Sequence, residues 1–251
     1  MEHVERPNLA IETLPLSRIN TVILTLFRKE FRGGKILELG AGKGALSARL
    51  AALGYQVTAA DFDPAGFLAP GIPCQKIDVE KPFPIPDGSF DFLVGIELIE
   101  HLENHFAFVR ECGRVLKPGG YLLLSTPNLL NLASRMKYLL TGFFSLCQRP
   151  NSEFERIRLY QHINPANYYN LRYILHTNNF RIQSVKTDRC RRSSLSLSFM
   201  YPLIRFLTGQ TMKGEPDSRQ VAVNSEIQSV LMSPEILFGR TLIVVARKGS
   251  E

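Results

Sequence analysis

The spacing of apolar residues along the chain predicts its secondary structure. Short apolar runs bounded by glycine, proline or polar residues predict buried strands, and apolar residues three and four positions apart predict helices. The expected strands span residues 36–39, 56–60, 72–77, 90–96, 121–126, 180–187 and 241–247, and the expected helices span 17–31, 45–53, 99–116, 129–146 and 166–177. Because strands and helices alternate, we expect an α/β fold with a doubly wound, mostly parallel sheet.

The ends of several elements carry local signals. Ser17 is a suitable N-cap for the first helix, and Pro165 suits the first position of the helix 166–177. The run Lys117-Pro-Gly-Gly is expected to end the helix 99–116. Residues 188–240 form a segment longer than an ordinary loop, which indicates an insertion.

A glycine-rich turn follows the first predicted strand. Gly40, Gly42 and Gly44 separate this strand from the helix 45–53, and Asp61 follows the second strand. Glycine tolerates positive φ angles and has no Cβ, so a ligand can lie against the backbone, while the helix N-terminus adds free N–H groups. An acid at the end of the second strand is placed to accept hydrogen bonds from a ribose diol. The unit is predicted to bind a nucleoside.

Two classes of protein share this turn. Gly40-x-Gly42-x-x-Ala45, with an acid about twenty residues further on, satisfies the dinucleotide-binding fingerprint. The same residues also read Glu38-x-Gly40-x-Gly42-x-Gly44, which is the pattern of class I S-adenosylmethionine-dependent methyltransferases. The turn alone leaves both alternatives open.

Two later runs decide between them. Asp87-Gly-Ser-Phe-Asp-Phe-Leu-Val-Gly-Ile-Glu-Leu-Ile-Glu-His-Leu102 resembles the fourth motif of class I methyltransferases, and Leu116-Lys-Pro-Gly-Gly-Tyr-Leu-Leu-Leu-Ser-Thr-Pro-Asn128 is similar to the next one. A dehydrogenase has no reason to carry this combination. The chain is identified as a member of the class I methyltransferases, close to the ubiquinone-type and related small-molecule or lipid-modifying members. The resemblance implies a seven-stranded Rossmann-like sheet and S-adenosyl-L-methionine as cofactor.

The resemblance also assigns residues to the cofactor. It implies that Glu38, Gly40, Gly42 and Gly44 surround the amino-acid end, that Asp61 binds the ribose hydroxyls, that Phe62 packs beside the adenine, that Asp78 accepts from the adenine amino group next to Val79, and that Ile96 and Glu97 line the sulfonium end. Each residue alone has a structural explanation, such as a tight turn or a helix cap. Their joint spacing favours the cofactor.

The same comparison organises the chain as a single methyltransferase domain, 1–251. Within it, residues 1–34 form an N-terminal helical segment and 35–128 the cofactor-binding core. Residues 129–178 and 188–240 are expected to be insertions that shape the acceptor pocket, because sites in such folds vary outside the common core.

Methyl transfer is an in-line displacement at a carbon that the sulfonium already activates, so alignment and exclusion of water are the main tasks of the protein. A general base is needed only when the acceptor must lose a proton, as a hydroxyl does. The candidate catalytic residues are His101 and His162; capping or positioning roles are the alternative for both. We expect no metal site.

Composition indicates an ordinary globular protein, with 45% hydrophobic and 21% charged residues among 251. Cys74, Cys112, Cys147 and Cys190 are scattered, which favours free thiols in a reducing compartment. The N-terminus shows no signal-peptide pattern, and no apolar run is long enough to span a bilayer, so we expect a cytoplasmic protein. Nothing in the sequence indicates an oligomeric state.

The second half of the chain combines basic and apolar residues. The net charge is +7, and basic residues gather at Arg156, Arg158, Arg181, Lys186, Arg189, Arg191 and Arg192. This set is either a solvated face or an attraction to anionic phospholipid; nucleic acid is the weaker alternative, because no basic-aromatic groove is evident. The apolar stretches 129–147 and 195–207 could cover a pocket, form a dimer contact or rest on a membrane.

Two functions therefore follow from the sequence. The first is methyl transfer to a hydroxyl of a small, lipid-linked or glycan-linked metabolite, with nitrogen or carbon as the alternative methylated atom. The second is a non-catalytic binding protein that keeps the cofactor fold. The intact glycines and Asp61 favour the enzyme.

Overall fold

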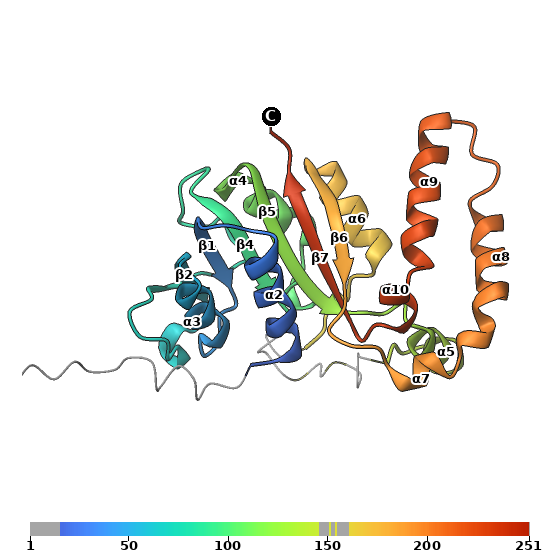
Figure 1. Ribbon diagram of the computed structural model, residues 1–251, viewed down its shortest axis with the longest axis horizontal. Coiled ribbons are helices and arrows are strands. Elements are labelled where there is room, and N and C mark those ends of the chain that lie inside the picture. Colours follow the sequence, from blue (N-terminus) through green and yellow to red (C-terminus); the bar gives the residue numbers. More distant parts are fainter. Residues whose placement is uncertain (1–15, 146–150, 152–153, 155–160, 251) are drawn as a thin grey trace, which may run out of the picture.

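A seven-stranded sheet forms the centre of the protein in the computed structural model, which describes residues 16–145, 151, 154 and 161–250 (Figure 1). Its strands are β1 (Lys35–Leu39), β2 (Gln56–Asp61), β3 (Cys74–Lys76), β4 (Phe90–Ile96), β5 (Leu116–Pro127), β6 (Phe180–Lys186) and β7 (Thr241–Lys248). They lie in the order β3-β2-β1-β4-β5-β7-β6. Neighbours among β1 to β5 are parallel, whereas β7 runs antiparallel to both β5 and β6. The predicted fold is confirmed.

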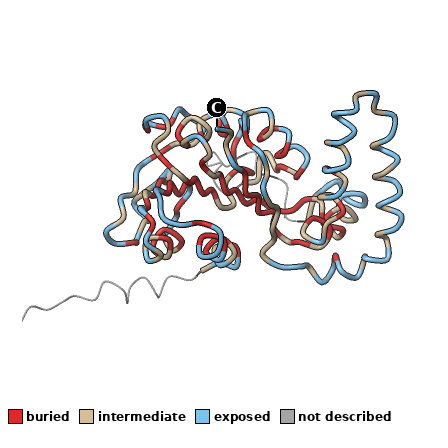
Figure 2. Tube along the Cα trace, turned by 45° about the horizontal axis from the view of Figure 1, so that its top comes forward, coloured by how far each residue is buried: buried red, intermediate tan, exposed pale blue. Residues whose placement is uncertain are grey.

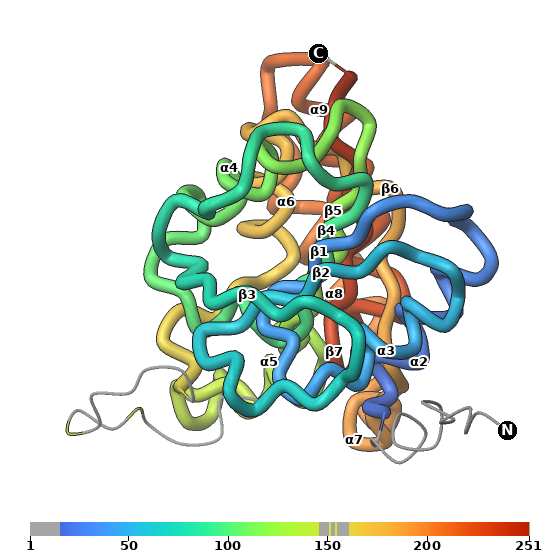
Figure 3. Tube along the Cα trace, turned by 90° about the vertical axis from the view of Figure 1, so that its left-hand side faces the viewer, coloured from blue at the N-terminus to red at the C-terminus, as the bar shows by residue number. Residues whose placement is uncertain are grey.

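Helices cover both faces of this sheet. On one face lie α2 (Arg18–Lys29) and α3 (Ala45–Ala52), and on the other lie α4 (His105–Val115) and α6 (Tyr168–Thr177). Figure 3 shows the sheet between these two helix layers. Along β5, Leu122 and Leu124 pack toward α4 and α6, whereas Leu123 packs toward α2 and α3. Successive side chains of a strand point to opposite faces, so a continuous apolar run is what a sheet buried on both faces requires.

The remaining helices lie beyond the β7 side of the sheet. They are α5 (Leu132–Thr141), α7 (Arg192–Leu195), α8 (Tyr201–Thr211), α9 (Ser218–Leu231) and α10 (Pro234–Phe238). In Figure 1, α8 and α9 stand side by side, away from the sheet. No residue of α8 is buried, and Ile227 is the buried residue of α9. Figure 2 accordingly shows this hairpin mostly exposed, in contrast to the strands.

Local signals were read correctly at some ends and wrongly at others. Ser17 caps α2 by accepting a hydrogen bond from Asn20 N. The expected helix 99–116 is wrong as one element, because a short 3-10 helix, η2 (Ile99–His101), is followed by a break, and Asn104 then caps α4. Pro165 does not begin α6, whose N-cap is Asn167.

Other elements also have bounds that differ from the predicted ones. The run Lys117-Pro-Gly-Gly is not a loop between α4 and the next strand, because β5 already begins at Leu116 and includes this run. The third strand is shortened to β3, and the helix 129–146 to α5. The long segment 188–240 is mostly helical, from α7 to α10. No helix within the described residues is long and apolar enough to cross a bilayer. Three cysteines there are free, and Cys147 lies outside these residues.

Candidate functional site

The carboxyl ends of four parallel strands bring the predicted cofactor residues to one edge of the sheet. In the β-ladders, Leu39 pairs with Ala60 on one side and with Gly95 on the other, and Asp61 pairs with Lys76. The residues that follow these pairs begin the loops above the edge. In open α/β sheets, ligands bind in the crevice outside these ends.

The glycine turn leaves bare backbone at this edge. Gly40, Gly42 and Gly44 all have positive φ angles, of 69°, 53° and 82°. A Cβ on Gly42 would meet no atom within 4 Å, whereas a Cβ on Gly44 would lie 2.6 Å from the Phe67 ring. Gly44 is therefore required for packing against the loop after β2, and Gly42 for an open approach to the backbone.

Asp61 joins the end of β2 to this turn. Its Oδ2 accepts a hydrogen bond from Gly42 N at 2.8 Å, and its Oδ1 accepts one from Asp63 N at 3.0 Å. The structure thus places Asp61 against the glycine turn, as the sequence predicts. The carboxylate orders two loops and remains partly exposed.

Glu38 lies behind the turn and is 4% exposed. It accepts a short hydrogen bond from the Ser47 hydroxyl on α3. Burial raises the pKa of Glu38 to about 7, and the nearby Asp61 carboxylate adds to this shift. A cationic ligand at the edge would offset this repulsion, because an opposite charge favours the ionised carboxylate.

The residues expected around the adenine lie on the β2 and β3 side. Phe62 is 47% exposed, with Lys76 Nζ 5.9 Å from its ring centroid. Asp78 accepts from Glu80 N at 3.1 Å and pairs with Lys81 at 3.1 Å, and Val79 packs against the core. Phe62 therefore lies about half exposed beside Lys76, whereas Asp78 is already engaged locally.

Ile96 ends β4 and Glu97 follows it, close to the end of β5. Glu97 has a φ of 49°, which is unusual for a residue with a side chain, and Ser125 fixes it. Glu97 N donates to the Ser125 carbonyl and hydroxyl at 3.1 and 3.0 Å. Burial raises the pKa of Glu97, and the Arg240 guanidinium partly opposes this shift. The strained backbone turns the chain at the site edge.

A cluster of three donor side chains lies just beyond Glu97. Single ligand atoms of Glu100, His101 and His162 all lie within 4.8 Å of one another. The two imidazole rings meet edge to face, with centroids 5.0 Å apart. The loop that carries His162 is fastened here, because Asn164 N donates to the Glu100 carbonyl at 3.1 Å. The structure therefore brings together the two predicted catalytic residues.

Glu100 itself is fully buried, and neither carboxylate oxygen has a hydrogen-bond partner in the described part of the chain. Thr126 lies close enough to influence the Glu100 carboxyl group. The Thr126 hydroxyl oxygen has no hydrogen-bond partner among the described residues either. Burial, followed by the charge of Glu97, raises the pKa of Glu100 to about 8.

Both histidines of the cluster have lowered pKa values, which favours the neutral imidazole. His101 Nδ1 lies 2.9 Å from the Gln161 carbonyl oxygen, and because a carbonyl can only accept, Nδ1 carries the proton and Nε2 is left as an acceptor. Burial lowers the pKa of His101, and it lowers that of His162, where the neighbouring His101 adds to the effect. Neutral imidazole is the form that can take a proton.

The comparisons with known proteins agree with this geometry. A family model described as a methyltransferase domain matches residues 12–185, more than half of the chain. The chain belongs to this methyltransferase family.

The curated relatives match a smaller part of the chain than the family model does. The methyltransferase chain is 35% identical over 125 residues to a ubiquinone biosynthesis O-methyltransferase of Xanthomonas oryzae pv. oryzae, covering 45% of this chain and 52% of the relative. It thus spans about half the length of the curated relatives it matches. An S-adenosylmethionine-dependent methyltransferase of Mesorhizobium loti shares the fold with a TM-score of 0.56 at 17% identity, covering 95% of this chain and 100% of that one.

The cofactor of this family is S-adenosyl-L-methionine. A Haemonchus contortus phosphoethanolamine N-methyltransferase, described in complex with S-adenosylhomocysteine and phosphomonomethylethanolamine, shares the fold with a TM-score of 0.54 at 15% identity over 93% of this chain and 52% of that one. At such identities these structures show the fold alone.

The donor set at the edge of this methyltransferase fits that cofactor. S-adenosylmethionine carries a sulfonium and an ammonium group, and the edge offers the carboxylates of Glu38, Asp61 and Glu97 beside the bare backbone of Gly42. The charge of the edge thus agrees with the methyltransferase alternative.

The buried Glu100 cluster is the feature that sequence reasoning missed. One carboxylate and two imidazoles are a donor set that can hold a divalent transition metal. Periodicity could not reveal it, because Glu100 occupies an apparently regular helical pattern and His162 lies in a distant loop. The signal available in the sequence was an acid next to a histidine immediately after a buried strand.

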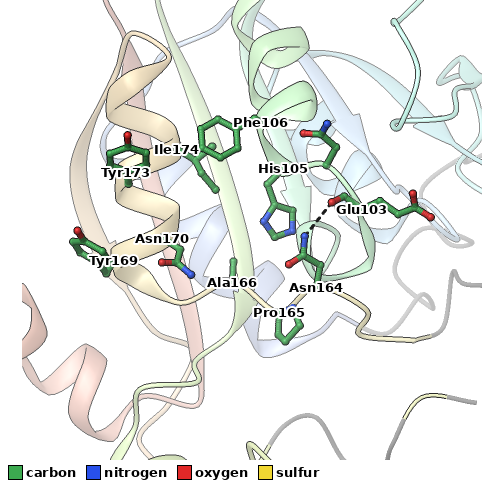
Figure 4. A pocket seen from close by; sticks show the side chains of 11 residues that line it. Glu103, His105, Phe106, Asn164, Pro165, Ala166, Tyr169, Asn170, Tyr173 and Ile174 are labelled. Carbon is green, nitrogen blue, oxygen red and sulfur yellow. Dashed lines mark hydrogen bonds between the residues drawn. The ribbon is translucent and has the colours of Figure 1, made fainter.

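A separate groove of about 510 Å³ opens between the N-terminal ends of α4 and α6 (Figure 4). Phe106, Tyr169 and Tyr173 form its aromatic wall, and Asn164, which donates to the Glu103 carbonyl at 3.1 Å, forms part of its polar side. The groove shares the loop 164–166 with the His162 segment, but none of the predicted cofactor residues lines it.

Proposed function

We propose that this chain catalyses the transfer of a methyl group from S-adenosyl-L-methionine to a hydroxyl of a small, lipid-linked or glycan-linked acceptor. The observation that carries the proposal is the convergence of Glu100, His101 and His162 next to Glu97 at the carboxyl edge of the sheet. A hydroxyl acceptor needs a group that removes its proton, and this cluster supplies neutral bases where the cofactor edge ends.

The cofactor residues have the roles that the family pattern implies. The glycine turn and Glu38 would hold the amino-acid end, Asp61 the ribose hydroxyls, and Phe62, Asp78 and Val79 the adenine. Ile96 and Glu97 would border the methyl group. The support for these roles is the common edge on which these residues lie and its acidic character.

The residues of the chain would divide the reaction as follows. The bound cofactor supplies an activated methyl carbon, so the protein needs only to align the acceptor and receive its proton. His101 is oriented for this task by its hydrogen bond to the Gln161 carbonyl, which leaves Nε2 as the proton acceptor. The loop 161–167, fastened to Glu100, would keep water from the acceptor side.

Single-turnover methyl transfer from labelled cofactor to a hydroxyl acceptor tests the proposal. We expect His101→Gln and His162→Gln each to slow the reaction by about 10²–10⁴-fold, the usual contribution of a general base, while binding of S-adenosylhomocysteine is unchanged. His176→Gln, on the last turn of α6, is the matched control. Unchanged rates in both variants would contradict the assignment, and a chelator added to the wild type shows whether a bound cation takes part.

We further propose that the protein is cytoplasmic, that residues 129–178 and 188–240 form its acceptor side, and that they allow it to contact an anionic membrane. Large apolar side chains on α5 and around α8 are exposed: Tyr138, Leu139, Leu140, Phe143, Leu195, Phe199, Leu203, Phe206 and Leu207. Arg192 and Arg205 are exposed near them. Apolar side chains beside basic ones are typical of interfacial helices. Arg156 and Arg158 lie outside the described residues.

Flotation with phosphatidylglycerol vesicles tests this contact. We expect the wild type to float at low salt, and the double variant Leu203→Ser with Phe206→Ser to remain in the soluble fraction. If the wild type stays in the soluble fraction at low salt as a dimer, and the double variant is a monomer, this surface joins two copies instead.

A further inference from the structure

Two arginines pair with one carboxylate where the chain enters β7, and a third arginine lies beside them. Arg189 Nε lies 3.8 Å from Asp188 Oδ2, and Arg240 Nη1 lies 3.7 Å from the same oxygen. The Asp188 side chain is 2% exposed, so this arrangement is set into the protein rather than spread over its surface. Arg191 is the third member, and its guanidinium is close enough to the other two for their charges to lower its pKa after burial.

Backbone contacts hold the three arginines in place. Arg240 N donates to the Arg189 carbonyl at 2.9 Å, and Arg191 N donates to the Phe238 carbonyl at 2.7 Å. Between them, Cys190 forms a β-bridge with Gly239. Two chain segments about fifty residues apart are thus tied together at the cluster.

The charge of this cluster is not balanced within the described residues. Arg189 and Arg240 pair with Asp188, and Arg191 lies beside them. Glu97 is the second carboxyl group near Arg240, so three positive groups meet two acidic ones, a local excess of one (3 − 2 = 1). Arg191 Nη1 is buried and has no hydrogen-bond partner there. A buried charged donor without an acceptor is costly, and an oxygen of an incoming anion would supply the missing acceptor.

The cluster borders the proposed reaction site. Thr241, the first residue of β7, pairs with Pro127 at the end of β5, and Asn128 N donates to the Arg240 carbonyl at 3.1 Å. Ser125, two residues before Pro127, holds Glu97. Arg240 and Asp188 accordingly shift the pKa of Glu97 in opposite directions.

We propose that Arg189, Arg191 and Arg240 form an anion subsite that binds a phosphate or diphosphate group of the methyl acceptor. The planar guanidinium fork matches phosphate oxygens in pairs, and several such forks around one point suit a group with three or more acceptor oxygens. This inference rests on the proposed function for the identity of the acceptor, but not for the binding of the anion. It narrows the acceptor to a phosphorylated compound, and the net charge of +7 would draw such a compound toward the protein.

Calorimetry of the full chain with inorganic pyrophosphate tests the subsite. We expect wild-type binding, and at least tenfold weaker binding by Arg240→Gln and by Arg191→Gln, since each removes a charge-assisted contact. Arg189→Gln gives a third variant, and because its side chain is 47% exposed this change does not disturb the interior. Arg181→Gln, at the opposite end of β6, is the matched control and should bind as the wild type does.

The same variants are titrated with S-adenosylhomocysteine, which should bind unchanged. No pyrophosphate binding by the wild type, or an equal loss in Arg181→Gln, would overturn the subsite and leave the cofactor proposal standing. If the wild type does not bind S-adenosylhomocysteine, the proposed function is overturned and the subsite stands. Phosphatidylglycerol vesicles distinguish the source of the phosphate: vesicle binding that falls with Arg240→Gln supports a lipid headgroup, and vesicle binding that does not supports a soluble phosphorylated acceptor.

Discussion

The cofactor half and the acceptor side of this protein are held together in different ways. In the first, strands β1, β4 and β5 are buried between two helix layers. On the acceptor side, α8 buries no residue, and α9 is fastened to α6 by the paired hydrogen bonds of Arg172 with Glu226, both 2.8 Å long. Apolar burial across a sheet thus fixes one half, whereas a small apolar cluster around Leu132, Met232 and Leu237, together with polar contacts, places the other.

The difference shows where each half can tolerate change. A site that must hold one cofactor benefits from a rigid edge, and the sheet supplies it. A surface that meets an apolar or charged partner must leave such groups exposed, so its stability cannot come from burying them. We therefore expect substitutions on the two sides to affect different measurements.

The largest effect should come from removing core volume. Leu123, in β5, is fully buried, whereas Leu203, in α8, is 55% exposed. Leu123→Ala should lower the free energy of unfolding by about 2–5 kcal/mol, and Leu203→Ala should change it by no more than about 0.5 kcal/mol. Chemical denaturation measures both. Equal losses would mean that α8 is packed in solution.

The next effect concerns the cofactor edge. Asp61→Ala should weaken binding of S-adenosylhomocysteine roughly 100-fold, or about 2.7 kcal/mol, because it removes charge-assisted acceptors and releases Gly42 N. Asp63→Ala, which removes the cap of the following 3-10 helix, is the neighbouring control and should bind normally. Calorimetry that finds both variants equal to the wild type would contradict the ribose assignment.

A third prediction lies between the two halves, at Glu100. Its folded-state pKa of about 8 exceeds the ordinary 4.5, so the folded protein keeps a proton that the unfolded chain loses. The stability of the wild type should therefore decrease as the pH rises from 4.5 to 8. Glu100→Gln cannot ionise at this position. The free energy of unfolding of Glu100→Gln minus that of the wild type should therefore be about 1–3 kcal/mol larger at pH 9 than at pH 5.

Denaturation curves at both pH values measure this difference, and Glu30→Gln, at an exposed position, should show none. If the difference in free energy of unfolding between Glu100→Gln and the wild type were the same at pH 5 and pH 9, the buried carboxylate would have to be ionised at both. A bound cation would have that effect.

The smallest effect should follow from releasing α9. Glu226 is 56% exposed at its side chain, whereas Arg172 is 5% exposed, so Glu226→Gln, which keeps an oxygen to accept from the buried guanidinium, should lower global stability by no more than about 1 kcal/mol. Glu226→Gln should instead accelerate amide hydrogen exchange in α9 while the strands keep their protection. Ser225→Ala, one residue earlier, leaves the pair intact and serves as control. Unchanged exchange would show that α9 is held by other contacts.

Much of the fold could be predicted because burial on both faces leaves a clear pattern. The strand 90–96 was predicted with the bounds that β4 has, and the cap at Ser17 was also correct. The break within 99–116 was missed because the apolar spacing continues across it. There, Glu103 N donates to Glu80 at 2.6 Å, a contact between distant residues that periodicity does not contain.

The site divides in the same way. The glycine turn and Asp61 lie within one βαβ unit, so local spacing was sufficient to bring them together. His101 and His162 were named separately, but their meeting with the buried Glu100 depends on a loop that folds back across the sheet edge. The association of Arg189 with Arg240 depends on the placement of β7, which a single sequence does not reveal.

The position of β7 has a consequence for how the molecule is made. Strand β7, the last one in the described part of the chain, lies inside the sheet, with β5 on one side and β6 on the other, and among the described strands β6 pairs with β7 alone. During synthesis, β1 to β5 can associate as they emerge, but β6 must wait for a partner made more than fifty residues later. Until then, the outer side of β5 is an open edge that can pair with other chains. We expect the nascent chain to depend on chaperones until its last strand closes the sheet.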